Sequence, residues 1–185
     1  MKIRPTREVR TTGKIQLLDK VTAELIAAGE VIDRPASVIK ELCENALDAG
    51  TTQLTVEIQR GGVTFMRVTD NGSGIEPEDI RTAFLRHATS KLRSAADLGN
   101  LMSLGFRGEA LASIAAMCRV EVLSRVPGQE EGVRYCIEGG AETECSPAGC
   151  PEGTTIVVRD IFYNTPARMK FLKKDTAEGG AVEEA

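Results

Sequence analysis

The chain has 185 residues, enough for one domain with a sizeable core, and its formal net charge is −4 at pH 7. That negative balance excludes a domain that clamps nucleic acid through its overall charge. Hydrophobic residues make up 42% of the chain but form no long run, so neither a transmembrane segment nor a secretory signal peptide is predicted.

The first half of the chain predicts two helices and a β-hairpin. Residues 1–14, "MKIRPTREVRTTGK", are basic and polar, and we expect a disordered arm there. Helices are predicted over 18–31 and 34–50, with Pro35 in the first turn of the second and Gly50 as its stop. Strands are predicted over 54–59 and 63–69, joined by a turn at Gly61 and Gly62.

The second half alternates helices with further strands. We predict helices over 76–85 and from 109, strands over 119–126, 132–139 and 154–162, and a loop over 146–153. The acidic residues 175–185 predict a solvated, disordered tail, which leaves 15–174 as the folded domain. This order predicts an α+β fold, a two-layer sandwich of helices packed on a mixed, mainly antiparallel sheet.

The helix over 34–50 combines an apolar stripe with an acidic stripe. Glu41, Asn45 and Asp48 fall within roughly 60° of one another around the helix axis. A solvated face has the same pattern. The absence of any lysine or arginine on this stripe after Lys40 favours chemistry instead: Glu41 can accept a proton from water, and Asn45 offers an amide oxygen to a hard cation.

The stretch "DNGSGI" has two interpretations. Asp70, Asn71 and Gly72 are typical of a turn. The functional alternative is that Asp70 accepts a hydrogen bond from an exocyclic amine, while Gly72 and Gly74 let a flat ring approach the backbone.

Two further motifs carry hydroxyls and positive charge. "RHATSK" supplies Thr89, Ser90 and Lys91, while its His87 is expected to be a structural hydrogen-bonding residue, because the sequence has no Gly-x-Ser-x-Gly elbow for a hydrolytic triad. In "GFRGEAL", glycines flank Arg107 and a helix begins near Glu109, a combination that predicts an anion cradle under a mobile lid over 90–108. Neither a Walker motif nor Gly-x-Gly-x-x-Gly occurs.

The cysteines and the histidine limit the metal chemistry. The five cysteines are odd in number and form no CxxC pair, so a disulfide framework and a zinc site are not expected, and a reducing cytosol fits. With His87 as the one histidine, a metal site needs oxygen ligands, which suit magnesium.

Taken together, these motifs resemble a known ATPase superfamily, that of gyrase, heat-shock chaperones, histidine kinases and MutL. Within it, "GFRGEAL", "IAAGEVIDRPASVIKEL", "RHATSK" and "FYNTPARMKFL" resemble the MutL mismatch repair proteins. The resemblance spans residues 15–172 and implies that ATP and Mg²⁺ are the cofactors.

The resemblance also implies a role for each matching position. Glu41 is implied as the general base that activates the attacking water, Asn45 as the magnesium ligand, and Asp70 as the residue that binds the adenine amino group. The remaining nucleotide-binding positions that it implies are Gly72, Gly74, Ile75, Thr89, Lys91, Gly105, Phe106, Arg107, Gly108, Glu109, Ala110, Leu111 and Thr154.

One departure from the family concerns the end of the sequence. Family members continue into a second ATPase subdomain, which supplies a lysine to the terminal phosphate, and into a dimerisation domain that in many members carries an endonuclease site. This sequence stops soon after "FLKKD", and "TAEGGAVEEA" does not resemble the family. We therefore expect a truncated piece that binds ATP weakly, stays monomeric and turns over ATP at a rate near or below detection.

The expected function is a magnesium-dependent ATP-hydrolysing module of a mismatch repair protein, with ATP as a conformational switch. The alternatives are a nucleotide switch without turnover, a histidine kinase-type domain and a gyrase-like subunit; "GFRGEAL" and "YNTPAR" fit the last two poorly. In the full-length protein the implied partners are mismatch-recognition and downstream repair proteins and a second copy in an ATP-dependent homodimer, with DNA bound weakly or through other parts, and no membrane. The implied location is cytoplasmic and nucleoid-associated in a bacterium, or nuclear in a eukaryote.

Overall fold

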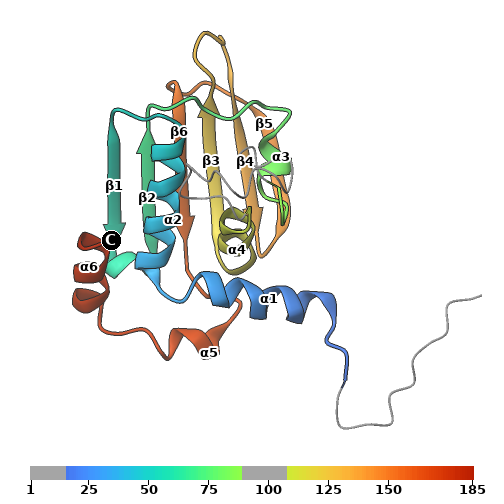
Figure 1. The fold of residues 1–185 in the computed structure, drawn as a ribbon, viewed down its shortest axis with the longest axis vertical. Coiled ribbons are helices and arrows are strands. Elements are labelled where there is room, and N and C mark those ends of the chain that lie inside the picture. Colours follow the sequence, from blue (N-terminus) through green and yellow to red (C-terminus); the bar gives the residue numbers. More distant parts are fainter. Residues whose placement is uncertain (1–15, 89–107) are drawn as a thin grey trace, which may run out of the picture.

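The computed structural model describes residues 16–88 and 108–185, which form one six-stranded sheet with helices on one face (Figure 1). The strand order is β1-β2-β6-β3-β4-β5. The strands are β1 (Leu54–Gln59), β2 (Phe65–Asp70), β3 (Arg119–Arg125), β4 (Gly132–Glu138), β5 (Ala141–Ala148) and β6 (Gly153–Arg159). Every pairing between these described strands is antiparallel, so the α+β prediction is confirmed but the expected mixture of strand directions is not found.

Two of the helices begin at residues that favour a helix start. They are α1 (Lys20–Val31), α2 (Pro35–Asp48), α3 (Ile80–Ala83), α4 (Ala110–Met117), α5 (Pro166–Met169) and α6 (Asp175–Glu183). Asp19 caps α1 by accepting a hydrogen bond from the Thr22 backbone N–H at 2.9 Å. Pro35 occupies the first turn of α2, and Gly50, just beyond its end, has a φ of 74°.

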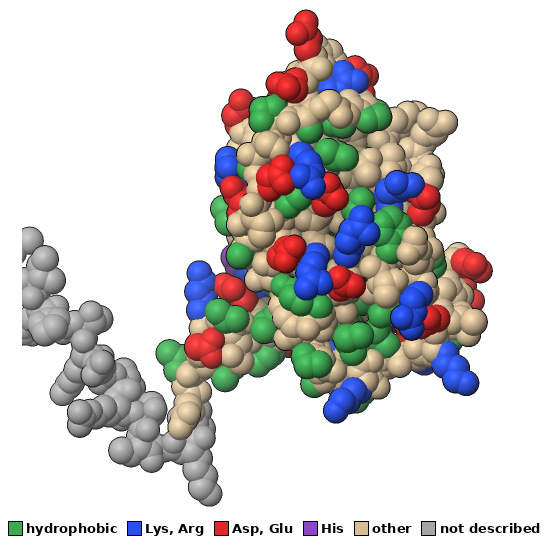
Figure 2. All heavy atoms as spheres, turned by 180° about the vertical axis from the view of Figure 1, so that it is seen from behind, with side chains coloured by type: hydrophobic (Ala, Val, Ile, Leu, Met, Phe, Trp, Pro, Cys, Tyr) green, Lys and Arg blue, Asp and Glu red, His purple; other side chains and the backbone are tan. Residues whose placement is uncertain are grey.

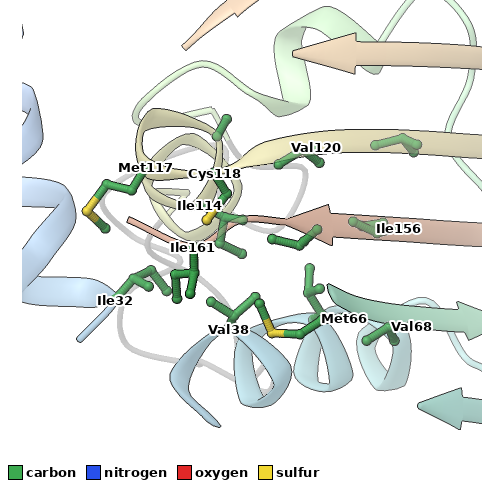
Figure 3. Packing of buried hydrophobic residues seen from close by; sticks show 14 of the residues in the cluster. Ile32, Val38, Met66, Val68, Ile114, Met117, Cys118, Val120, Ile156 and Ile161 are labelled. Carbon is green, nitrogen blue, oxygen red and sulfur yellow. The ribbon is translucent and has the colours of Figure 1, made fainter. Parts of the chain in front are cut away.

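The core lies between the inner face of the sheet and helices α2 and α4. Because successive strand residues point to opposite faces, every second residue of β3 is buried. Met66, Val120 and Val158 are fully or almost fully buried there. Figure 3 shows Met66 and Val120 in this layer, with Met66 beside Val38 of α2 and Val120 on the side of Ile114 of α4. This layer fixes α2 and α4 over the central strands.

Strands β1 and β2 form the predicted hairpin, with a short 3-10 turn η1 (Arg60–Gly62) between them. Gly61 has a φ of 66°, and a side chain there would come 2.4 Å from the Asp175 carbonyl oxygen. The glycine therefore forms the turn and also makes room for α6, which packs against it.

The predicted disordered tail over 175–185 is wrong, because residues 175–183 form α6. Glu178 is almost fully buried and accepts hydrogen bonds from the Arg34 side chain (3.0 Å) and the Lys173 backbone N–H (2.8 Å). Asp175 pairs with Arg60 at 3.0 Å. Two of the acidic residues that suggested solvation, Asp175 and Glu178, instead pair with arginines more than 100 positions earlier in the chain.

Strand β5 was missed because its second half, with Pro147, falls in the segment predicted as a loop. The strand lies at the edge of the sheet, where only one side pairs. A proline is tolerated at an edge because its missing N–H can face away from the neighbouring strand.

The outer face of the sheet carries interleaved acidic and basic side chains with apolar ones between them (Figure 2). Arg134 bridges Glu121 and Glu144 there, and Arg67 pairs with Glu57. In the described ranges, no helix is long and apolar enough to cross a bilayer.

Candidate functional site

The site begins with a polar row on the inner face of the sheet, formed by Asp70, Thr154 and Ser124. Asp70 of β2 lies opposite Thr154 of β6, which lies opposite Ser124 of β3. The next inner row along the same strands is apolar: Val68, Ile156 and Val122. At one end of these three adjacent strands, polar side chains thus occupy the inner-face positions that apolar core side chains occupy further along.

Asp70 is half-buried, and its surroundings favour a hydrogen-bond acceptor. Its carboxylate accepts a hydrogen bond from the Gly72 backbone N–H at 2.8 Å. Burial raises the pKa of Asp70, and hydrogen bonding from the backbones of Gly72 and Thr154 partly offsets this rise. A carboxylate has two oxygens with about four lone-pair sites, so Asp70 has the capacity to accept a further hydrogen bond from a ligand.

The glycines after Asp70 are required by close packing. A side chain on Gly72 would come 2.9 Å from Ala49, and one on Gly74, whose φ is 69°, would come 2.5 Å from the Arg125 carbonyl oxygen. The Ser73 N–H donates to the Ala49 carbonyl at 3.0 Å. These contacts place the loop between the end of α2 and the end of β3. Contact of the glycines with a flat ring stays a prediction.

Asn71 and Ser124 were not identified from the sequence. Asn71 Oδ1 accepts hydrogen bonds from the Thr52 and Gln53 backbone N–H groups at 2.9 and 2.8 Å, and from the Thr51 hydroxyl at 2.8 Å. It ties the connection between α2 and β1 to the loop. The Asp-Asn-Gly turn signal could have identified Asn71, whereas one serine in an alternating strand gives no signal.

Helix α2 brings Glu41 and Asn45 toward this end of the sheet. The two are one turn apart, both are half-buried, and the neighbouring stripe with Ile39, Leu42 and Ala46 is buried in the core. The Ala49 contacts with Gly72 and Ser73 join this helix to the Asp70 loop. Asp48 is exposed.

The described ends of the "RHATSK" and "GFRGEAL" motifs meet. The His87 backbone N–H donates to the Gly108 carbonyl at 2.9 Å, and His87 Nδ1 lies 3.4 Å from Glu109 Oε1. His87 has a φ of 63° and an exposed side chain. Gly108, Glu109, Ala110 and Leu111 are half-buried at the start of α4. Five predicted site residues lie outside the described residues: Thr89, Lys91, Gly105, Phe106 and Arg107. All of the predicted lid over 90–108 except Gly108 lies outside them as well.

The donor set suits magnesium better than a transition metal. Across residues 16–88 and 108–185, no group of three or more His, Cys, Asp or Glu side chains is placed to hold a metal ion. The five cysteines are unpaired. Magnesium bound to phosphates needs only one or two protein oxygen ligands, and Asn45 offers a hard oxygen on the helix beside the loop.

Comparison with known proteins places this fold and site in one class. The profile of the histidine kinase-, DNA gyrase B- and HSP90-like ATPases matches residues 33–138, more than half of the chain. The chain is 54% identical over 170 residues to the DNA mismatch repair protein MutL of Agathobacter rectalis, which covers 92% of this chain and 26% of that protein.

Two solved structures share the fold. The Aquifex aeolicus MutL ATPase domain complexed with ADP is 36% identical with a TM-score of 0.65, over 83% of this chain and 53% of that one. The N-terminal domain of a DNA repair protein is 26% identical with a TM-score of 0.72, over 87% and 46%.

The chain therefore belongs to the histidine kinase-, DNA gyrase B- and HSP90-like ATPase family, and within it to the MutL mismatch repair proteins. It spans about a quarter of the length of the curated relatives that it matches.

Proposed function

We propose that this chain binds ATP through the polar row and hydrolyses it with magnesium, as the ATP-dependent switch of a DNA mismatch repair protein. The observation that carries the proposal is the half-buried Asp70 carboxylate beside Thr154, at the end of an otherwise apolar sheet face. Adenine presents an amino donor next to a ring-nitrogen acceptor. Asp70 accepts from the former, and the Thr154 hydroxyl can donate to the latter.

The catalytic half of the proposal rests on α2. Glu41 acts as the general base that takes a proton from the attacking water, and Asn45 supplies an oxygen ligand to magnesium. Magnesium, when bound, would neutralise charge on the phosphates during their transfer to water. The close contact between Ala49 and Gly72 sets where this helix ends relative to the base-binding loop.

The start of α4 supports a phosphate site. Gly108 precedes this eight-residue helix with a φ of 60°, and no side chain of the described residues caps the helix N-terminus. The backbone N–H groups of a helix N-terminus favour an anion. We propose that Thr89, Lys91 and residues 105–111 contact the phosphates. The similar Aquifex aeolicus domain was solved with ADP.

The switch is proposed for the whole protein. His87 and Gly108 are hydrogen-bonded, which brings the described ends of the two motifs together beside the start of α4. A nucleotide held there can order the lid predicted over 90–108 and favour a homodimer that engages other repair proteins. Hydrolysis then releases both.

Replacing Asp70 with asparagine tests the nucleotide assignment. The amide puts a donor where the adenine amine needs an acceptor, so ATP affinity should fall by about 10- to 100-fold. Calorimetric titration with a non-hydrolysable ATP analogue and magnesium measures it. Asp79→Asn, the same change at an exposed carboxylate, should leave affinity unchanged. Equal affinity in Asp70→Asn and the wild type would refute the adenine assignment.

A further inference from the structure

Ser124 is a fully buried hydroxyl near the end of β3, and it contacts two separate parts of the proposed base site. Its Oγ accepts a hydrogen bond from the Ile75 backbone N–H at 2.9 Å. It also lies 3.1 Å from the Gly153 carbonyl oxygen and 2.9 Å from Thr154 Oγ1. One side chain therefore joins the glycine loop to strand β6.

The Ser124 hydroxyl can donate its one hydrogen either to the Gly153 carbonyl oxygen or to Thr154 Oγ1. A hydroxyl has one hydrogen and two lone pairs, and the Ile75 N–H uses one lone pair. If Ser124 donates to the Gly153 carbonyl, the Thr154 hydroxyl must donate its own hydrogen to Ser124. Thr154 can then only accept a hydrogen bond from a ligand. If Ser124 donates to Thr154, the Thr154 hydroxyl keeps its own hydrogen for the ligand.

We propose that Ser124 is a positioning residue for base recognition: it holds the Gly74–Ile75 turn and, by donating to Thr154, directs the Thr154 hydroxyl toward the base. The second half rests on the proposed function. The ring nitrogen beside the amino group of adenine is an acceptor, and the matching ring nitrogen of guanine carries a hydrogen. A donating Thr154 next to the accepting Asp70 therefore selects adenine over guanine.

The backbone around Ser124 fixes this geometry. Gly74 packs against the carbonyl of Arg125, the next residue of β3. The Arg125 side chain in turn donates to the Cys150 and Gln129 carbonyls, both at 2.7 Å. The Ser124 hydroxyl is thus held on a strand end that is itself tied to two neighbouring loops.

Amide exchange without nucleotide tests the hold on the turn. In Ser124→Ala the Ile75 N–H loses its acceptor, and its exchange measured by NMR should quicken about tenfold. The control is Thr155→Val, which removes a hydroxyl that donates to Thr69 Oγ1 at 3.2 Å on the opposite face of the sheet. Unchanged Ile75 exchange in Ser124→Ala would overturn the positioning role, whether or not the chain binds ATP.

Nucleotide selectivity tests the direction of the Thr154 hydroxyl. In Ser124→Ala the affinity for ATP should fall about tenfold while that for GTP stays the same, so the ratio of the two dissociation constants falls. Thr154→Val keeps the Ser124–Ile75 bond, and it should lose the same selectivity with Ile75 exchange unchanged. An equal loss for both nucleotides would show a merely structural role. Failure of the wild-type chain to bind ATP would refute the proposed function alone, and the exchange of Ile75 would still decide the role of Ser124.

Discussion

Asp70 gives the site a pH dependence with a defined sign. Burial raises its pKa above the ordinary value of 3.8, so the carboxylate gains a proton at a higher pH than an exposed aspartate does. The charged carboxylate costs folding stability at neutral pH, and that cost disappears as the pH falls through the raised pKa.

ATP affinity should therefore weaken on acidification while the fold remains intact. Protonated Asp70 carries a hydrogen where the adenine amine needs an acceptor. Calorimetry from pH 7 downward should show the loss beginning above the usual aspartate range, and the Asp70→Asn variant should show no such step. A wild-type affinity that stays flat until pH 4 would contradict the assignment.

Glu41 is expected to act on water and not on the nucleotide. With the complete ATPase region as host, Glu41→Ala should leave ATP affinity unchanged and slow hydrolysis by about 10²- to 10⁴-fold, measured in single-turnover experiments at saturating ATP and magnesium. Glu44→Ala is the control on the same helix, because Glu44 pairs only loosely with Lys40, at 4.0 Å. If Glu44→Ala abolished hydrolysis and Glu41→Ala did not, the general base would be Glu44.

Helix α6 is held by two ion pairs of different burial. Glu178 is 2% exposed in its pair with Arg34, whereas the pair between Arg60 and Asp175 is 69% and 47% exposed. Arg34→Met leaves a buried carboxylate without its partner and should lower the free energy of unfolding by about 3 kcal/mol. Arg60→Met should cost less than about 1 kcal/mol. Urea denaturation of both variants measures the difference, and equal losses would show that α6 does not depend on the buried pair.

Individual elements differ in how far the sequence could predict them. Pro35, Gly50 and Gly61 act locally, through fixed or positive φ angles, and the elements they bound were predicted correctly. Strand β5 was missed because only its position at the sheet edge makes Pro147 acceptable. Helix α6 was missed because Glu178 and Asp175 in its first turn pair with Arg34 and Arg60, and only the folded chain creates these pairs.

The candidate site, too, could be predicted only where its residues belong to local sequence motifs. Asp70, Glu41 and Asn45 were predicted because each belongs to a recognisable local motif. The row that Asp70 forms with Thr154 and Ser124 depends on the register of three strands that are distant in sequence. No local sequence pattern indicates that register, so the contacts of Ser124 and Asn71 are visible only in the folded chain.

The central claim is that this inner-face row binds the base of ATP. The most direct measurement is a crystal structure of the chain with a non-hydrolysable ATP analogue and magnesium. We predict the adenine amino group within hydrogen-bond distance of the Asp70 carboxylate, a ring nitrogen facing the Thr154 hydroxyl, and the phosphates directed toward the start of α4. A nucleotide bound elsewhere, with Asp70 and Thr154 making no contact with the base, would contradict the account.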